Sequence, residues 1–242
     1  MILDLLLETI LPRLCVVCEK KGVYPQWFCA SCRKDILFVP HPQCERCGYP
    51  LSEQLCSVCL THPKKNTFDF HRSLFLYEGV ASDLIARYKF GKKRELALCF
   101  GNLFCEYHPY IEGNFILPIP LFKSRLRKRG FNQSLEMARV ISKIKKTPLL
   151  DGLIKLKSTQ PQTELSRQER LHNLRNIFVW KGKSLVGEKI ILIDDVLSTG
   201  ATMAEAARTL KTAGAKQVMA YTVCLNVLTP SPQPLSLRER GG

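Results

Sequence analysis

Eight cysteines near the start of the chain form four Cys-x-x-Cys pairs, and this pattern restricts the fold more than any other feature. The pairs are Cys15/Cys18, Cys29/Cys32, Cys44/Cys47 and Cys56/Cys59. The two-residue spacing lets both thiolates of a pair face one metal ion, and two such pairs complete the tetrahedral four-sulfur shell that suits Zn²⁺. The pattern predicts two zinc sites, most simply one from the first two pairs and one from the last two. Sequence spacing alone also permits interleaved pairing.

Redox-active dithiols and disulfides are the alternative interpretations of a Cys-x-x-Cys pair. Four pairs within 45 residues, without a thioredoxin-like context, favour zinc. We expect a structural role, because an all-cysteine shell leaves no coordination position for a substrate. A segment this short has a small core, so the metal would supply much of its folding energy. The other three cysteines, Cys99, Cys105 and Cys224, lie on expected helices or strands and should be buried.

Hydropathy indicates no membrane span, because no run of about 18 uncharged apolar residues occurs. The N-terminal stretch MILDLLLETILP is apolar but carries Asp4 and Glu8 and lacks a basic start. We therefore expect a short amphipathic helix there rather than a signal peptide. These features predict a cytoplasmic chain, and a reducing compartment agrees with metal-bound or free thiols.

The pattern changes to alternating strands and helices after a stretch rich in Pro, Lys and Asn at 61–68. Strands are expected at 73–79, 114–120, 177–180, 189–194 and 217–225, and helices at 80–90, 94–107, 131–146 and 201–213. This alternation predicts an α/β fold with a mostly parallel sheet flanked by helices. The expected organisation is an N-terminal helix and zinc module at 1–64, an α/β domain at 65–228 and a disordered Pro-rich tail at 229–242.

The segment IILIDDVLSTGATM (190–203) combines a buried strand, two acids, a short loop and a helix. Asp194 and Asp195 end the strand, at the sheet edge where open α/β folds bind ligands. The loop (196–200) and the helix start would offer backbone N–H groups and a positive dipole end to an anion. The carboxylates could accept hydrogen bonds from sugar hydroxyls, while a ligand-borne Mg²⁺ eases charge repulsion. The plain structural alternative is a Ser/Thr helix cap after an acid-ended strand.

The net charge of +15, from 36 Lys+Arg and 21 Asp+Glu, is concentrated in one segment. Residues 116–185 hold 16 basic and 4 acidic residues, an excess of 12. A basic stretch of this size fits either nucleic-acid binding or a site for a phosphate-rich small ligand.

The segment IILIDDVLSTGAT (190–202) resembles the phosphoribosyl pyrophosphate (PRPP) motif of type I phosphoribosyltransferases. Together with an N-terminal double zinc ribbon, it resembles the ComF/GntX family of competence- and gluconate-uptake-associated proteins. Further matching stretches lie at 76–96, 117–139 and 159–180, so the resemblance covers about residues 11–225. It implies a type I phosphoribosyltransferase-like domain after a zinc-ribbon module, and a PRPP-binding protein associated with DNA uptake in natural transformation.

The resemblance also implies roles for individual residues. Asp194 and Asp195 would bind the ribose hydroxyls of PRPP, and the 5′-phosphate would lie on Ser198, Thr199, Gly200, Ala201 and Thr202. Lys123 and Arg125, in the loop after the 114–120 strand, would lie near the pyrophosphate. Arg167 and Arg170 belong to a mobile hood loop at 159–172. The expected catalytic residues are Asp194, Asp195, Arg125 and Arg167, with Mg²⁺ accompanying PRPP.

Two residues or motifs have no role that the sequence settles. Lys89 either faces the site or is solvated, and the RGFNQ stretch (129–133) is a family signature without a derivable function.

Three functions compete at this stage. As an enzyme, the chain would displace pyrophosphate from C1 of PRPP with an unknown acceptor. As a single-stranded DNA-binding protein without turnover, it would use the basic and aromatic run SRLRKRGF (124–131), with the DNA-uptake machinery at the cytoplasmic membrane face as a partner. A regulator that keeps the fold without catalysis is the third.

Overall fold

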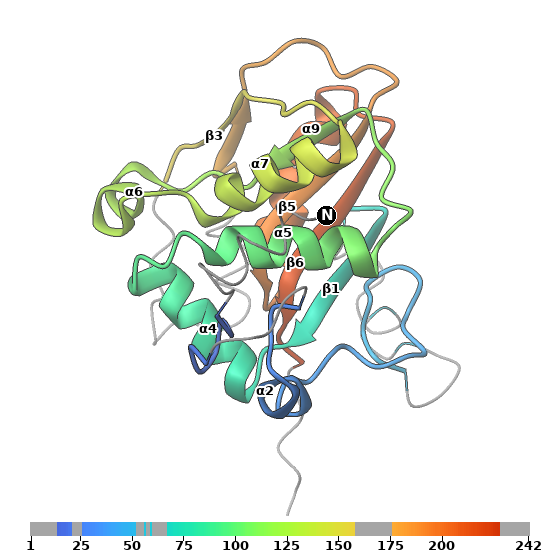
Figure 1. The fold of residues 1–242 in the computed structure, drawn as a ribbon. Coiled ribbons are helices and arrows are strands. Elements are labelled where there is room, and N and C mark those ends of the chain that lie inside the picture. The colour runs from blue at the N-terminus through green and yellow to red at the C-terminus, as the bar shows by residue number, and fades with distance from the viewer. Residues whose placement is uncertain are drawn as a thin grey trace, which may run out of the picture.

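The computed structural model describes residues 14–20, 26–51, 56, 59, 67–157 and 176–227. Its main sheet has the strand order β1-β6-β5-β2 and is parallel throughout (Figure 1). The strands are β1 (Phe70–Leu76), β2 (Phe115–Pro118), β5 (Lys189–Leu197) and β6 (Gln217–Leu225). The two central strands are almost entirely buried, as expected of parallel strands covered on both faces. The predicted α/β class with a mostly parallel sheet is confirmed.

Helices cover both faces of this sheet (Figure 1). The helices α4 (Gly79–Phe90), α5 (Leu96–Tyr107) and α7 (Gln133–Lys145) lie on one face, and α9 (Ala201–Thr212) lies on the other. Alternate residues of β5 divide between two hydrophobic clusters. Ile191 and Ile193 join the cluster of the first three helices, whereas Ile190 and Leu192 join that of α9. None of the helices in the described ranges combines the length and hydropathy needed to cross a bilayer.

A second, two-stranded sheet pairs β3 (Leu153–Lys155) with β4 (Phe178–Trp180) in antiparallel orientation. The sequence predicted a strand at 177–180 but gave no sign of its partner β3. The segment 158–175 between them lies outside the described residues. The expected hood loop, including Arg167 and Arg170, belongs to that segment.

Three local differences from the sequence expectation affect the site. Strand β5 continues to Leu197, so the loop before α9 is reduced to 198–200. The expected loop after β2 contains a short helix, α6 (Lys123–Arg129), which ends at Gly130 in the left-handed region with φ 80°. Asn132 caps α7, so Phe131 precedes this helix, and its side chain is buried at 4% exposure.

The zinc module packs directly on the α/β domain through one edge of the sheet. Residues 37–39 run antiparallel to β1, with bonds from Val39 N to Leu74 O (3.0 Å) and from Leu76 N to Leu37 O (2.9 Å). At the opposite edge, residues 148–150 bond to Ile116 of β2. Both outer strands of the sheet therefore have a backbone partner.

Candidate functional site

Asp194 and Asp195 lie at the carboxyl end of β5, and each carboxylate has its own partner. Oδ1 of Asp194 accepts hydrogen bonds from Ser134 Oγ (2.8 Å) and from the backbone N–H of Asp195 (2.9 Å). Oδ1 of Asp195 pairs with Lys89 Nζ at 2.8 Å, and these two side chains are only 11% and 17% exposed. Asp194 is thus held by α7, and Asp195 by the last turn of α4.

The environment of Asp194 disfavours its charged form. Burial and the adjacent charge of Asp195 raise the pKa of Asp194 to about 6, although the hydrogen bonds and Lys89 oppose the shift. A carboxyl group with a strongly raised pKa near the carboxyl end of a central parallel strand marks a candidate functional site.

Side chains of the RGFNQ stretch (129–133) form hydrogen bonds that hold the helices around the site in position. The side chain of Asn132 accepts a hydrogen bond from Ser134 N (3.1 Å) and donates one to Ile119 O (3.0 Å), which fixes the start of α7 against the end of β2. The side-chain oxygen of Gln133 accepts a hydrogen bond from Arg129 Nη1 (3.0 Å), and its backbone carbonyl accepts one from the Tyr88 hydroxyl (2.7 Å). These bonds connect α4, α6 and α7 around the carboxylates.

Further cations lie within electrostatic range of the acids. Burial and Arg129 lower the pKa of Arg125, while Asp195 opposes that shift. Burial and Arg125 lower the pKa of Lys155, while Asp194 opposes it. Arg125, which the sequence analysis expected near the pyrophosphate, comes from α6. Lys155 comes from β3. Lys123 is exposed at the start of α6.

The predicted phosphate cradle forms the turn between β5 and α9. Gly200 is the N-cap of α9 and has φ 73°, a left-handed conformation that favours glycine. Thr199 Oγ1 accepts a 3.4 Å bond from Ala201 N, and the hydroxyl-bearing residues Ser198 and Thr199 are exposed. Thr202 is partly buried in the first turn of the helix. First-turn N–H groups have no acceptor within their own helix, so this turn can receive an anion.

Sequence reasoning missed Ser134, Tyr88 and Lys155, and it left Lys89 undecided. These residues come from α7, α4 and β3, and only the tertiary fold brings them to the end of β5. The signature RGFNQ, directly before Ser134, was the one signal that could have pointed to α7.

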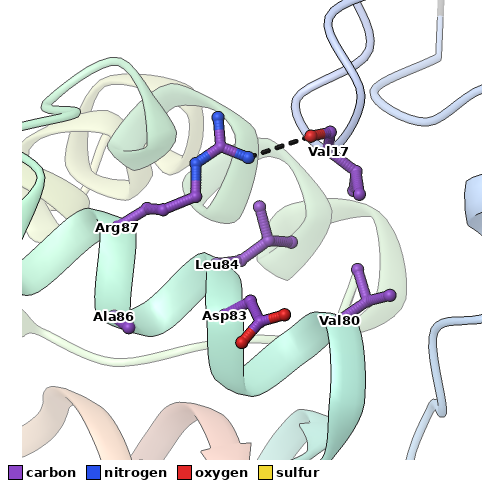
Figure 2. A pocket seen from close by; sticks show the side chains of 6 residues that line it. All are labelled: Val17, Val80, Asp83, Leu84, Ala86 and Arg87. Carbon is purple, nitrogen blue, oxygen red and sulfur yellow. Dashed lines mark hydrogen bonds between the residues drawn. The ribbon is translucent and has the colours of Figure 1, made fainter.

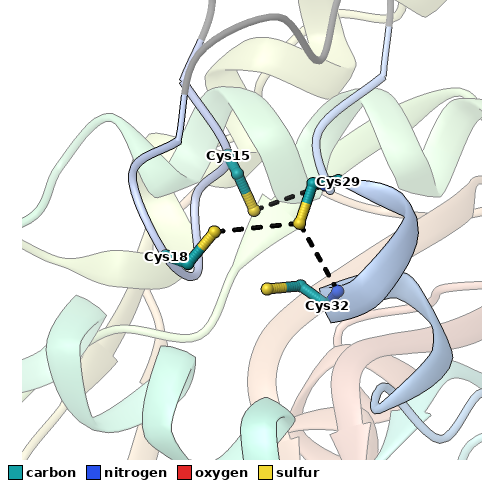
Figure 3. Close-up of side chains that lie close together, drawn as sticks. All are labelled: Cys15, Cys18, Cys29 and Cys32. Atoms are coloured by element: carbon teal, nitrogen blue, oxygen red, sulfur yellow. Dashed lines mark hydrogen bonds between the residues drawn. The ribbon is translucent and has the colours of Figure 1, made fainter.

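The eight paired cysteines form two clusters in sequence order. The Sγ atoms within each cluster lie within 4.8 Å of one another. Figure 3 shows the four side chains of the first cluster converging on one point, with Cys18 and Cys29 sulfurs 3.7 Å apart. Zinc–sulfur bonds of about 2.3 Å in a tetrahedron place sulfurs about 3.8 Å apart, so these clusters have the donor atoms and spacing of a zinc site.

Backbone amides also donate hydrogen bonds to sulfurs of the first cluster, which favours the thiolate form. Cys29 N donates to Cys15 Sγ (3.4 Å), and Cys32 N donates to Cys29 Sγ (3.5 Å). Burial alone would raise the pKa of Cys15, but hydrogen bonds from backbone amides outweigh it and lower that pKa to about 6. The thiolate is the form that binds metal.

Two side chains of β1 attach the second cluster to the sheet. The buried ring of His71 lies with Nδ1 2.9 Å from Cys47 O and Nε2 2.9 Å from Thr222 Oγ1. Arg72 donates to the carbonyls of Cys44 (3.3 Å) and Glu45 (2.9 Å). The module and the sheet therefore share a buried polar contact.

The first cluster meets α4 beside a hollow of about 380 Å³. Figure 2 shows Arg87 reaching from α4 to the carbonyl of Val17, and Arg87 also bonds to Val16 O, both at 3.0 Å. The residues that line this hollow are distinct from those around Asp194 and Asp195.

Comparison with known proteins identifies both parts of the chain. Residues 6–61 match the family model described as Double zinc ribbon domain, and residues 115–233 match Phosphoribosyl transferase domain. Competence protein ComFC of Bacillus subtilis is 33% identical over 204 residues, covering 81% of this chain and 82% of that protein. The chain belongs to the ComF family. Another relative of this ComF protein, DNA utilization protein YhgH of Escherichia coli K12, is 28% identical over 226 residues, covering 88% and 97% of the two chains.

Two solved structures that are similar to the ComF chain share little of its sequence. Glutamine PRPP amidotransferase from B. subtilis is 19% identical, with a TM-score of 0.38 over 52% of this chain and 26% of that one. Adenine phosphoribosyltransferase from Leishmania tarentolae is 13% identical, with a TM-score of 0.38 over 58% and 74%. The ComF protein has a type I phosphoribosyltransferase fold, consistent with its family model and its parallel sheet.

Proposed function

We propose that this ComF protein binds PRPP at the carboxyl end of β5 and transfers its phosphoribosyl group to an acceptor, with release of pyrophosphate. The observation that carries this proposal is the position of the acid pair. The acids precede the β5–α9 turn, which suits a phosphate, and the cations Lys89 and Arg125 both interact with Asp195.

Each part of the site has a role in this reaction. The turn at 198–202 receives the 5′-phosphate, and Asp194 and Asp195 accept hydrogen bonds from ribose hydroxyls. The acceptor forms a bond to C1 as the C1–oxygen bond to pyrophosphate breaks, and the electron pair leaves with pyrophosphate. Arg125 neutralises charge on the leaving group. We assign the same role to Arg167, and a supporting role in PRPP binding to Lys123.

The acid pair suits Mg²⁺ that arrives on the ligand. Within the described residues, the groups with enough ligands for a metal cage are the two cysteine clusters. Asp194 and Asp195 are instead two carboxylates that could share Mg²⁺ with substrate phosphates, which is its usual mode of binding. When bound, Mg²⁺ supplies charge neutralisation between the diphosphate and the carboxylates. The two cysteine clusters would each hold one structural zinc ion.

The names of the relatives support a cellular context for this proposal. They are named as competence proteins and a DNA utilization protein, so the proposed role serves DNA uptake from the cytoplasmic side of the membrane. Partners in the DNA-uptake machinery are part of this proposal.

Calorimetric titration with Mg–PRPP tests the ligand. Wild-type protein should release or absorb heat on binding, and Asp195→Ala should abolish it. Asp83→Ala, which changes an exposed carboxylate on α4, should leave binding intact. Absence of heat at millimolar PRPP would overturn the proposal. If PRPP binds, pyrophosphate release against a panel of nucleobases tests turnover.

Phe90 favours a second candidate function, single-stranded DNA binding. The expected stacking residue, Phe131, is buried and cannot stack a base. Phe90 instead has a side chain 66% exposed, with the Arg129 guanidinium 5.4 Å from its ring centroid. Arg127 and Lys128 are exposed on the adjoining helix α6. An exposed aromatic beside cations can stack a base and follow a phosphate backbone.

The matched pair Phe90→Ala and Tyr110→Ala tests this candidate. Single-strand affinity should fall steeply with salt, and Phe90→Ala should weaken it by about 1–3 kcal/mol. Tyr110 is also an exposed aromatic residue, at 89%, but it follows α5. Equal affinity in the two variants would count against a stacking role for Phe90.

A further inference from the structure

We propose that Cys18 and Cys29 of the first cysteine cluster are a peroxide-sensitive pair, and that their oxidation to a disulfide releases zinc and loosens helix α4. The assignment needs the zinc sites but does not depend on PRPP. It gives the first cluster a reactive chemistry beyond its structural role and distinguishes it from the second cluster.

The two clusters differ in how accessible their cysteines are. Among the eight paired cysteines, Cys18 alone is exposed. In the second cluster, Cys44 and Cys47 are buried, at 8% and 4% exposure. A metal-bound thiol is deprotonated, and oxidation of a cysteine follows its thiolate character and its access to solvent. Cys18 is therefore the ligand that a small oxidant such as hydrogen peroxide should reach first.

The sulfur of Cys29 lies 3.7 Å from that of Cys18, so a second thiolate is at hand (Figure 3). The Cys18 thiolate attacks one oxygen of hydrogen peroxide, the O–O bond breaks, and a sulfenic acid and hydroxide form. The Cys29 thiolate then attacks the Cys18 sulfur, so the S–S bond forms as the S–O bond breaks and a second hydroxide leaves. Two electrons pass from the two sulfurs to the peroxide. The zinc ion keeps two of its four thiolates and is released.

Arg87 connects the metal-binding turn of the first cluster to α4. Its Nη1 donates to the carbonyl oxygens of Val16 and Val17, both at 3.0 Å, and these two residues lie between the first pair of ligands. Its Nη2 pairs with Glu19 at 3.2 Å. A disulfide requires sulfurs about 2.0 Å apart, so the turn must shift when the bond forms. The contacts of Arg87 should weaken with that shift.

The hollow of about 380 Å³ beside Arg87 gives the turn room to move (Figure 2). Val17 lines it from the turn, and Leu84 lines it from α4. Side chains of the described residues leave this space open, so the polar bonds of Arg87 carry much of the attachment. Their loss should raise the local unfolding of α4. The same helix holds Asp195 through Lys89, so oxidation at the cluster would also loosen the support of the acid pair.

Zinc release and amide hydrogen exchange on the full chain test the proposal. Wild-type protein of measured zinc content is treated with hydrogen peroxide. It should release about one of its two zinc atoms, and peptide mass spectrometry should find a disulfide between Cys18 and Cys29. Amide exchange in α4 (Gly79–Phe90) should then rise by about tenfold, the size of one lost hydrogen bond to a charged group. A reducing thiol with added zinc should reverse both changes.

Two variants separate the oxidation from its effect on α4. Cys18→His keeps a Cys₃His shell for zinc but removes the exposed thiolate, so peroxide should release its zinc about tenfold more slowly. Arg87→Met should release zinc as wild type does, but exchange in α4 should be fast before treatment and should not rise further. Arg139→Met, at an exposed arginine of α7, should match wild type in both measurements.

Several results would overturn the proposal. Loss of both zinc atoms at one rate would do so, as would no loss at peroxide concentrations that oxidise free thiols. A disulfide between other cysteines, or unchanged exchange in α4 after zinc release, would also contradict it. If Cys18→His does not bind zinc, the mapped disulfide and the order of zinc release in wild type decide. Purified wild type without zinc would overturn the proposal together with the metal sites.

Discussion

Ser134 Oγ donates a 2.8 Å hydrogen bond to Oδ1 of Asp194, which joins the first turn of α7 to the carboxyl end of β5. Ser134→Ala would leave this carboxylate oxygen with the Asp195 N–H as its remaining partner among these bonds. We expect Mg–PRPP affinity to fall by about tenfold in calorimetry, the size of a hydrogen bond to a charged group. Ser142→Ala removes a hydroxyl that bonds Thr147 O at the other end of α7, and affinity should not change. Equal affinities in the two variants would contradict the positioning role of Ser134.

Asp194 should give the protein a measurable pH dependence of stability. Its pKa is raised from 3.8 to about 6 by burial and by the charge of Asp195. The folded chain therefore holds this proton more tightly, and the stability it confers is present below about pH 4 and lost as pH rises through 6. Asp194→Asn keeps the neutral shape, so its advantage over wild type should grow between pH 4 and pH 7.5 by at most about 3 kcal/mol.

Urea unfolding of wild type and Asp194→Asn at several pH values provides the measurement. The difference between the two proteins isolates Asp194, because the histidines and cysteines titrate in both. A difference that stays constant across this range would show that the pKa of Asp194 is not raised in the folded protein.

The cysteine clusters predict the metal content of the purified protein. Metal analysis should give about two zinc atoms per chain, and Cys47→Ser should reduce this to about one. A strong chelator should lower the unfolding temperature, because metal binding and folding of a small module are coupled. Cys105→Ser, which changes a half-buried thiol outside both clusters, should keep both zinc atoms. Zinc near zero in wild type would refute both sites.

His71 should matter for stability although it lies outside the ligand site. Burial lowers the pKa of His71 to about 4, so the ring is neutral at pH 7 while it contacts Cys47 O and Thr222 Oγ1. His71→Ala leaves a cavity and unpaired buried polar groups, which should cost about 2–4 kcal/mol in urea unfolding. His41→Ala, at an exposed histidine, should cost about 0.5 kcal/mol or less. Similar costs for the two variants would exclude a structural role for the His71 contacts.

The sequence was most informative where one element carries the whole signal. Strand β6 has the predicted bounds of 217–225, and the acids of β5 and the start of α9 follow one another along the chain. The cysteine pairs likewise cluster in sequence order. The short elements β3 and α6 escaped prediction, because three to seven residues are too few for a periodic hydrophobic pattern.

Tertiary contacts explain the remaining misses at the site. Ser134 and Lys89 lie far from Asp194 and Asp195 in sequence and meet them only through the packing of α7 and α4. Phe131 and Phe90 flank basic residues in the same way along the chain, yet one is buried among α4 and α5 residues and the other is exposed. Local composition could not distinguish these two rings.

The backbone pairing of residues 37–39 with β1 affects the tendency of the protein to aggregate. A strand at the edge of a sheet presents N–H and C=O groups that a second chain can pair with. The zinc module covers that edge, so loss of its metal would uncover an aggregation template on an otherwise intact domain. In this protein, the cysteines would then protect the solubility of the phosphoribosyltransferase fold as well as the shape of the module that contains them.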